Sequence, residues 1–462
     1  MNYRPFQFSG QYFESFSINE EFPMYCFYKS NITNITIGEN IEIIPPLGFA
    51  YSEVESINLE NIKLISSNSF LGCMKLIHIR FSDKLEYIGP YAFDECHNLQ
   101  SIIINTNKTI EVGDGAFKTC GLLNSNLSNI ASVIRNIPRY CFSNNYRREN
   151  NVVLHPSVKT LGMESFYMFA GSIKLNEGLE VIEERCFQYS PIKSIAIPST
   201  VRYIGDEAFE YCEYLESIEI PSSVTYLGIS CFYRCYKLKS AIIGKGITKL
   251  QQYSFYDCIE LENINILGNI TYFGYGSICS GKITKFKFLP NTTSEKDAFG
   301  FGLIELFEIG ENSVISFNAF HSACLNIILN DNISIYNPYY TLIYNVNVYY
   351  IGKAKYDYEV DQSLYYTWNF NNYTKVYVTS LYKSSTFCGL DVIHTDSNPF
   401  ENFKHIGFKF SDLELFRMNF ENPNEICDFN AYVTRNDAYF NKKVHKLVPS
   451  LIFCNSILIN PK

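Results

Sequence analysis

The chain has 462 residues and a formal net charge of −9, with 38 basic and 47 acidic side chains and no long run of either sign. A nucleic-acid-binding protein normally needs a concentrated basic face, so nucleic acid is not expected as a partner. No segment approaches the roughly 20 apolar residues of a membrane-spanning helix, and the N-terminus lacks the apolar core of a signal peptide, so we expect no membrane span and a soluble, unsecreted protein.

The first twenty residues contain several aromatic side chains but no copy of the repeat that follows. These aromatic residues are Phe6, Phe8, Tyr12, Phe13 and Phe16. A stack of strands leaves an open edge at its first strand, and apolar side chains can cover such an edge. We therefore predict an N-terminal cap over residues 1–20.

From residue 21 onward a unit of 21 to 25 residues recurs, with apolar side chains at fixed offsets. A fixed period of this length is typical of a solenoid, in which each unit forms one coil and stacks on its neighbours. The clearest copies lie between residues 192 and 258. Nearly every copy contains a phenylalanine, and these are Phe27, Phe49, Phe70, Phe93, Phe117, Phe142, Phe166, Phe187, Phe209, Phe232, Phe255, Phe299 and Phe320, with Ile278 in the slot between Phe255 and Phe299.

The spacing within one unit predicts a short strand followed by an irregular return path. Leu215, Ile218 and Ile220 follow the spacing of a strand that buries one row of side chains and exposes the other. Pro221 ends this strand, because proline has no N–H to donate to a strand ladder. Phe232 then places a large ring in the interior of the return path.

The unit L-x-x-I-x-I-P-x-x-V-x-x-I-G-x-x-A-F-x-x-C resembles the BspA-like leucine-rich repeat, which occurs in surface antigens of anaerobic bacteria and parasitic protists. The resemblance and the period together predict a leucine-rich repeat solenoid. This fold is a curved stack of short parallel β-strands, with turns and short helical or irregular segments on the return path. We expect about fourteen coils over residues 21–352, distorted near residues 121–151.

The fifteen cysteines follow the repeat rather than the pairwise spacing of a disulfide framework. Six lie three residues after a repeat phenylalanine: Cys73, Cys96, Cys120, Cys212, Cys235 and Cys258. Four lie just before one: Cys26, Cys141, Cys186 and Cys231. Residues at one repeat position form a column, and small buried thiols are a common choice for a protein core. We expect reduced, buried thiols, with a disulfide ladder as the alternative.

The repeat weakens towards the C-terminus. Residues 353–393 are rich in tyrosine and end in one more repeat-like unit, and tyrosine is already frequent from Tyr336. After about His394 the repeat is absent. The residues Ser411–Glu414 have the form of a helix capping box, so residues 394–462 are predicted to be a C-terminal cap or a small accessory module.

Two segments resemble sites of known chemistry, and neither is convincing. Gly276 to Lys282 has the spacing of a phosphate-binding loop, but Ile283 stands where a magnesium-binding hydroxyl is required and Ile278 fills the repeat phenylalanine slot. His321 and Cys324 lack a second pair of metal ligands. Because no nucleophile, base and orienting group occur at motif spacing, we predict no enzyme activity, no cofactor and no metal site.

The exposed row of the strands is the candidate binding face. It is mostly small and polar in one column and mixed in the next, and solenoids commonly use such surfaces for recognition. A merely solvated sheet is the alternative. The candidate residues are His78, Arg80, Lys174, Ser194, Ser217, Glu219, Ser240, Asn263, Asn265, Lys285 and Lys287.

These observations leave two hypotheses for function, and both involve a protein partner. The resemblance implies a cell-surface antigen or adhesin that contacts host proteins, matrix or other cells. The missing signal and membrane segments and the reduced-looking cysteines instead favour a cytoplasmic scaffold for protein–protein interaction. The sequence leaves the partner and the oligomeric state open.

Overall fold

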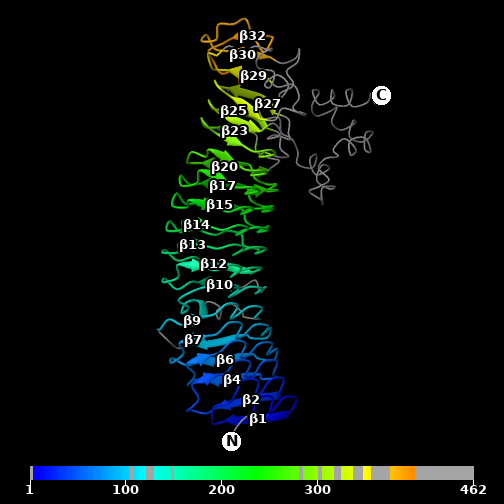
Figure 1. Cartoon of the computed structure of the whole chain (residues 1–462), viewed down its shortest axis with the longest axis vertical. Helices are drawn as coiled ribbons and strands as arrows, with labels where there is room; N and C mark the ends of the chain where they lie inside the picture. The colour runs from blue at the N-terminus through cyan, green and yellow to red at the C-terminus, as the bar shows by residue number, and fades with distance from the viewer. Residues whose placement is uncertain are drawn as a thin grey trace, which may run out of the picture. The chain divides into compact units, whose positions relative to one another are not determined.

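The computed structural model describes residues 4–104, 108–120, 129–146, 150–279, 283, 285–299, 304–316, 324–336, 347–354 and 375–400. The chain forms two compact units, Met1–Cys279 and Ser280–Lys462, and each is described by itself. Within each unit, successive coils stack through parallel strands (Figure 1), which confirms the predicted solenoid.

One line of strands in the first unit carries the alternating pattern predicted from the repeat. In β15 (Ser217–Ile220), Ile218 and Ile220 are buried while Ser217 and Glu219 are exposed. Parallel pairing sets these residues beside their counterparts in the next coil. The other strands of this line are β1 (Tyr12–Ile18), β2 (Asn31–Ile37), β4 (Ser56–Leu59), β6 (His78–Phe81), β8 (Ser101–Ile104), β10 (Asn150–Val153), β12 (Gly171–Lys174), β17 (Ser240–Ile243) and β20 (Asn263–Ile266).

A second line consists of two-residue strands. Each lies in one coil, after the turn that follows the longer strand and just before the return path. In β16 (Tyr226–Leu227), Tyr226 faces outward and Leu227 is buried. This second ladder could not be predicted from the residue pattern, because two residues are too few to show a period. Its other members are β3 (Ile43–Ile44), β5 (Leu64–Ile65), β7 (Tyr87–Ile88), β9 (Glu111–Val112), β11 (Thr160–Leu161), β13 (Val181–Ile182), β14 (Tyr203–Ile204), β18 (Lys249–Leu250) and β21 (Tyr272–Phe273).

The repeat phenylalanines form one buried column through the first unit. Phe232 is fully buried, and its ring centroid lies 5.3 Å from that of Phe209 and 5.1 Å from that of Phe255. These rings are nearly parallel, with interplanar angles of 8° and 12°. Because each ring fills the space between its neighbours, the coils interlock along the column.

The backbone on either side of each repeat phenylalanine forms the edge of the coil, which we call the turn edge. Phe232 N–H donates to the carbonyl of Ser254 in the next coil at 2.9 Å, and Ser230 N–H donates to Gln252 at 2.9 Å. Ser230 itself has a left-handed conformation, with φ of 54°. The turn edge is therefore a third hydrogen-bonded line between coils; in the last two coils of the first unit it is regular enough to form β19 (Phe255–Tyr256) and β22 (Ile278–Cys279).

The second unit continues with the same two kinds of parallel strand. One line consists of β23 (Lys285–Phe288), β25 (Ile304–Ile309), β27 (Cys324–Leu329), β29 (Asn347–Tyr350), β30 (Val376–Val378) and β32 (Leu390–His394), and the other of β24 (Thr293–Ser294), β26 (Val314–Ser316) and β28 (Ser334–Tyr336). The last strand, β32, also pairs antiparallel with β31 (Thr386–Phe387).

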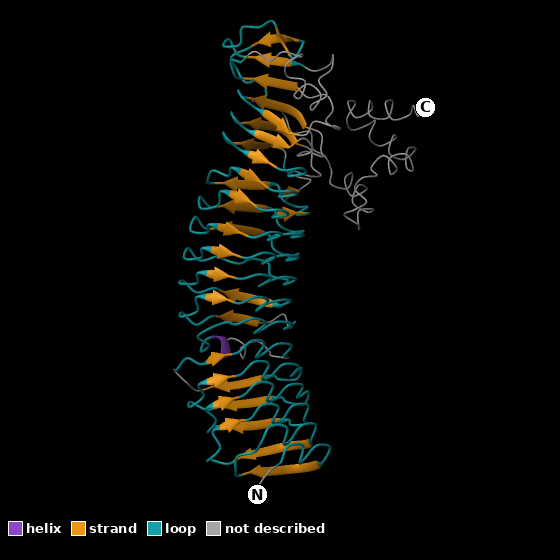
Figure 2. Cartoon of the chain, in the orientation of Figure 1, coloured by secondary structure: helices purple, strands orange, loops and turns teal. Residues whose placement is uncertain are grey.

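The structure departs from the sequence-based expectation in two respects, one missing strand and a low helix content. No strand is assigned to residues 192–198, although Ile195 and Ile197 are still buried. One bond to the next coil remains, from the Glu216 N–H to the Lys193 carbonyl at 3.0 Å. Helix is also scarcer than expected on the return path: the only helical residues in the described chain are 129–131, coloured purple in Figure 2.

The distorted stretch near residues 121–151 keeps the column of rings. The ring of Phe142 lies 5.9 Å from that of Phe117 and 5.5 Å from that of Phe166. Single parallel bridges join Ile110 to Ile134 and Ile137 to Leu161 in place of full strands.

Residues at the N-terminus reproduce part of a coil. Phe8 occupies the position of a repeat phenylalanine, and its ring stacks on Phe27 at 4.8 Å and 8°. The strand β1 then pairs in parallel with β2. The proposed N-terminal cap would thus use the same contacts as the repeats. The proposed C-terminal cap or module, including Ser411–Glu414, lies outside the described residues, apart from residues 394–400.

Candidate binding surfaces

The predicted binding face is an exposed row of side chains on the longer strands, which we call the strand face. Register places Ser217, Ser240 and Asn263 in one column across β15, β17 and β20. In the next column Glu219 lies beside Ile242, and Ile242 lies beside Asn265. All eleven predicted residues are solvent-exposed except Ser240, which is half-buried.

The structure brings together only some of the predicted residues. His78 and Arg80 lie on β6, between β4 and β8, several coils away from the column on β15. Lys174 lies on β12 and Ser194 in the segment without a strand, while Lys285 and Lys287 belong to the second unit. The predicted residues of the first unit are therefore separate polar side chains spread over several coils.

Charges on the strand face are dispersed. Lys174 lies beside Val153, and Glu219 lies beside Ile242, so neither has an opposite charge as its register partner. Lys287 does have one, because its Nζ lies 2.5 Å from the Glu308 carboxylate on β25. Partly exposed pairs of this kind add little to stability.

The turn edge carries a second candidate surface, which the sequence analysis did not find. Tyr189, Tyr211 and Tyr253 stand two residues from a repeat phenylalanine and have φ of 60°, 54° and 57°. This left-handed conformation is uncommon for residues other than glycine. It is held by bonds to the next coil: Tyr189 N–H donates to Glu210 at 2.9 Å, and Tyr211 N–H to Tyr233 at 2.8 Å.

Tyrosine rings touch one another along this edge in an unbroken series, which we call the tyrosine ladder. Its members are Tyr167, Tyr189, Tyr211, Tyr233, Tyr253, Tyr256 and Tyr275. The Tyr189 and Tyr211 rings stack at 4.6 Å, and the Tyr233 and Tyr256 rings at 5.3 Å. Burial raises the pKa of Tyr233 to about 12, so its phenol is neutral at physiological pH.

One arginine sits within the ladder. The Arg234 guanidinium lies 5.4 Å from the Tyr211 ring centroid and 5.2 Å from that of Tyr233, distances suited to cation–π attraction. Its Nη1 donates to the Tyr211 hydroxyl at 2.6 Å. Its Nε lies 3.5 Å from the Asp257 carboxylate.

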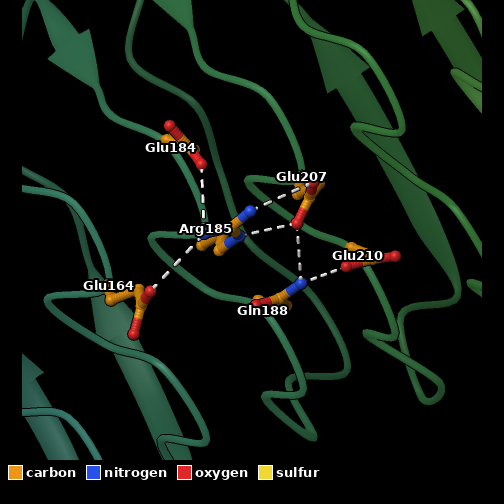
Figure 3. Close-up of polar contacts among 6 residues, drawn as sticks. All are labelled: Glu164, Glu184, Arg185, Gln188, Glu207 and Glu210. Atoms are coloured by element: carbon orange, nitrogen blue, oxygen red, sulfur yellow. Dashed lines mark hydrogen bonds and ion pairs between the residues drawn. The ribbon is translucent and has the colours of Figure 1, made fainter.

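Several carboxylates gather beside the ladder, and we call Glu164, Glu184, Glu207 and Glu210 the glutamate cluster (Figure 3). Arg185 lies among them, with its nearest nitrogens 2.7 Å from Glu207, 3.2 Å from Glu184 and 3.9 Å from Glu164. The Gln188 amide donates to both Glu207 and Glu210. Burial raises the pKa of Glu164 and of Glu210, because the charged form loses hydration.

A sequence signal for the ladder exists in hindsight. Tyr167, Tyr233 and Tyr256 follow a repeat phenylalanine directly, and Tyr189 and Tyr211 stand one residue further. The tyrosine-rich stretch that is conspicuous in the sequence begins at Tyr336 instead. Its residues 337–346 and 355–374 lie outside the described chain.

The cysteine columns are buried as predicted, and they also make hydrogen bonds. Cys235 Sγ donates to the carbonyl of Phe209 in the preceding coil at 3.2 Å, and Cys258 Sγ to that of Phe232 at 3.1 Å. Ser190 stands at the same repeat position and donates to Phe166 at 2.7 Å. Nine of the described cysteines are free and buried: Cys26, Cys73, Cys96, Cys120, Cys141, Cys186, Cys212, Cys231 and Cys235.

The remaining chemical motifs do not form sites in the described structure. Ile278 is buried in the phenylalanine slot on β22, while residues 280–282 of the loop-like motif lie outside the described chain. The His321 and Cys324 side chains also lie outside it. Within the described residues, no group of three His, Cys, Asp or Glu side chains could hold a metal ion, and no helix is long and apolar enough to cross a membrane.

A family model for the BspA type leucine-rich repeat region (6 copies) matches residues 20–149, 135–259, 180–302 and 205–329, more than half of the chain. No curated protein matches significantly.

Several solved structures are similar to the chain. A leucine-rich cell surface protein from Faecalibacterium prausnitzii is 18% identical, over 62% of this chain and 83% of its own, with a TM-score of 0.34. A leucine-rich repeat protein from Bacteroides ovatus is 19% identical, over 70% and 87%, with a TM-score of 0.30. The pneumococcal vaccine antigen PcpA is 18% identical, over 86% and 91%, with a TM-score of 0.33.

Proposed function

Because the chain belongs to the BspA-type leucine-rich repeat family, we propose that it is a non-enzymatic protein-binding solenoid whose strand face contacts the partner. The observation that carries this proposal is the strand face itself. Its polar side chains project from strands that are hydrogen-bonded to both neighbours, as on β17 between β15 and β20. A surface held in this way loses little conformational entropy when a partner binds.

The finer proposal is a surface antigen or adhesin that contacts host proteins, matrix or other cells. It rests on the resemblance of the repeat to those of surface antigens. A second candidate, an intracellular scaffold, is favoured by the free, buried thiols, which suit a reducing compartment. Labelling intact cells with an impermeant biotin reagent separates the two: labelling supports the adhesin, whereas labelling only after lysis supports the scaffold.

Binding through the strand face is tested by reversing its charges. Arg80→Glu, Lys174→Glu and Glu219→Lys change exposed side chains on β6, β12 and β15, so we expect the melting temperature to stay unchanged. Binding to a partner identified by photo-crosslinking from Ser217 should weaken severalfold, mainly through slower association. Arg202→Glu is the matched control, because Arg202 is exposed outside the strand face, next to β14.

Unchanged affinity after all three reversals would remove the strand face from the binding site. Turnover of a substrate that a single polar substitution abolishes would contradict the non-enzymatic proposal.

A further inference from the structure

The tyrosine ladder holds one guanidinium of its own, and this contact indicates what kind of ligand the ladder accepts. Arg234 lies over the Tyr211 and Tyr233 rings and donates to the Tyr211 hydroxyl at 2.6 Å. The two rings meet edge to face, with centroids 5.8 Å apart and an interplanar angle of 62°. Such a pair offers a cation two rings together with a hydroxyl acceptor.

A second pair meets at a similar distance and angle, with its two repeat positions in the opposite order along the chain. Tyr167 and Tyr189 meet at 5.7 Å and 71°. The position equivalent to Arg234 in the coil of Tyr167, two residues after the repeat phenylalanine, is the uncharged Met168. No cation from the described part of the chain lies over either ring.

Tyr189 has an exposed ring and a backbone in the left-handed conformation. The side chain is 41% exposed and therefore contributes little to the core. Its φ of 60° is a conformation that glycine or asparagine adopts more readily than tyrosine. The same conformation recurs along the turn edge at residues as different as Leu47 and Glu164, so it belongs to the repeat, and what distinguishes Tyr189 is its exposed ring.

The glutamate cluster gives this end of the ladder a negative potential. Glu164 and Glu210 stand in the same turns as Tyr167 and Tyr211. Three of the four carboxylates lie around the Arg185 guanidinium, and the fourth, Glu210, contacts Gln188 (Figure 3). Arg185 is already paired with Glu207 and Glu184. The excess negative charge favours a cation and repels a polyanion.

We propose that the Tyr167–Tyr189 pair and the adjoining glutamate cluster bind arginine side chains from an extended segment of another protein, reproducing the contacts of Arg234. Arginine fits better than lysine, because a planar guanidinium stacks on a ring while donating in fixed directions to a hydroxyl or carboxylate. This second binding surface goes beyond the proposed strand-face function.

The test uses the full chain and a fluorescein-labelled peptide of alternating arginine and glycine, measured by fluorescence anisotropy. Peptides with lysine or citrulline in place of arginine are the matched ligands. We expect the arginine peptide to bind most tightly and its binding to weaken with added salt. Tyr189→Ala should weaken that binding about tenfold, from the loss of a cation–π contact.

Two control variants separate this site from the general surface. Tyr203→Ala alters the stacked Tyr203–Tyr226 pair, 4.9 Å apart on the second line of strands, and should leave peptide binding unchanged. The double variant Glu164→Gln, Glu184→Gln removes two charges of the glutamate cluster and should weaken binding of the arginine peptide severalfold. Its matched control is the double variant Glu213→Gln, Glu216→Gln, which removes two exposed charges outside the cluster and should leave that binding unchanged. Melting curves confirm that each variant is folded.

Three results would overturn the proposal: no binding of the arginine peptide at low salt, equal binding of the lysine peptide, or equal loss from Tyr189→Ala and Tyr203→Ala. Ladder-dependent binding to a glycan array in place of the peptide would also overturn it. Reversals on the strand face should leave peptide binding unchanged, so failure of the proposed function and failure of this inference are distinguishable.

Discussion

Replacing Phe232 by alanine tests whether the phenylalanine column holds the coils together. The ring is fully buried between Phe209 and Phe255, at 5.3 and 5.1 Å. Removing a buried phenyl ring costs about 3–5 kcal/mol of unfolding free energy, through lost burial and the cavity left behind. A separate estimate agrees, since burial of roughly 150 Å² at about 25 cal/mol per Å² gives about 4 kcal/mol.

The measurement is urea unfolding followed by far-UV circular dichroism. Because each coil contacts only its neighbours, the loss should appear either as a lower midpoint or as an earlier separate transition of the coils around Phe232. Phe232→Leu keeps most of the apolar volume and should cost clearly less. Tyr214→Ala, which removes a side chain that is 48% exposed, should stay within about 0.5 kcal/mol. A loss below about 1 kcal/mol for Phe232→Ala would refute the interlocked column.

Three further predictions concern the thiols. Cys235→Ser should be tolerated, because Ser190 makes the equivalent bond. Cys235→Ala removes the Sγ donor, but the Phe209 carbonyl keeps the Cys212 N–H at 3.2 Å, so this substitution should cost only about 0.5–1.5 kcal/mol in urea unfolding. Burial raises the pKa of Cys73 and Cys186 from 9.0 to about 12. The contribution of these thiols to the free energy of unfolding is therefore complete below pH 9 and should be lost as pH rises towards 12. A urea midpoint that is constant over this range would contradict their burial. Titration of the denatured, unreduced chain should find most of its fifteen cysteines as free thiols, and finding only one or two would show a disulfide ladder.

The core and the strand face could be predicted because burial alone determines them. Ile218 and Ile220 alternate with exposed neighbours, and hydrophobic periodicity records that alternation directly. The same reasoning failed at residues 192–198, which have the apolar spacing of a strand but no ladder. Side-chain spacing reports which face is buried, whereas the ladder depends on N–H groups that spacing does not reveal.

The turn edge could not be predicted, because its conformation comes from neighbouring coils rather than from its own residues. Left-handed positions usually contain glycine or asparagine, yet here they contain residues as different as Leu47, Glu164, Arg185 and Tyr211. What these positions share is an N–H that donates to the next coil, as Leu47 does to Ser67 at 3.2 Å. This pairing is a tertiary contact, and it overrides the local preference.

Glycine at some of these positions makes room for the tyrosine ring of the preceding coil. Gly72 stands one coil after Tyr51, and the Tyr51 ring occupies the space that a Cβ at Gly72 would need, at 2.4 Å. Gly115 receives the ring of Tyr91 in the same way. Where the next coil carries glycine, a tyrosine ring can lie over the backbone, and no ring continues the series at that position. Where the next coil carries another tyrosine, as Tyr211 follows Tyr189, the rings must stack and the ladder extends. A Cβ at Gly276 would likewise meet the Tyr253 ring, yet the tyrosine ladder there continues through the neighbouring Tyr275. Glycine or tyrosine at one of these positions therefore decides whether a ring lies over the backbone of the next coil or stacks on another ring.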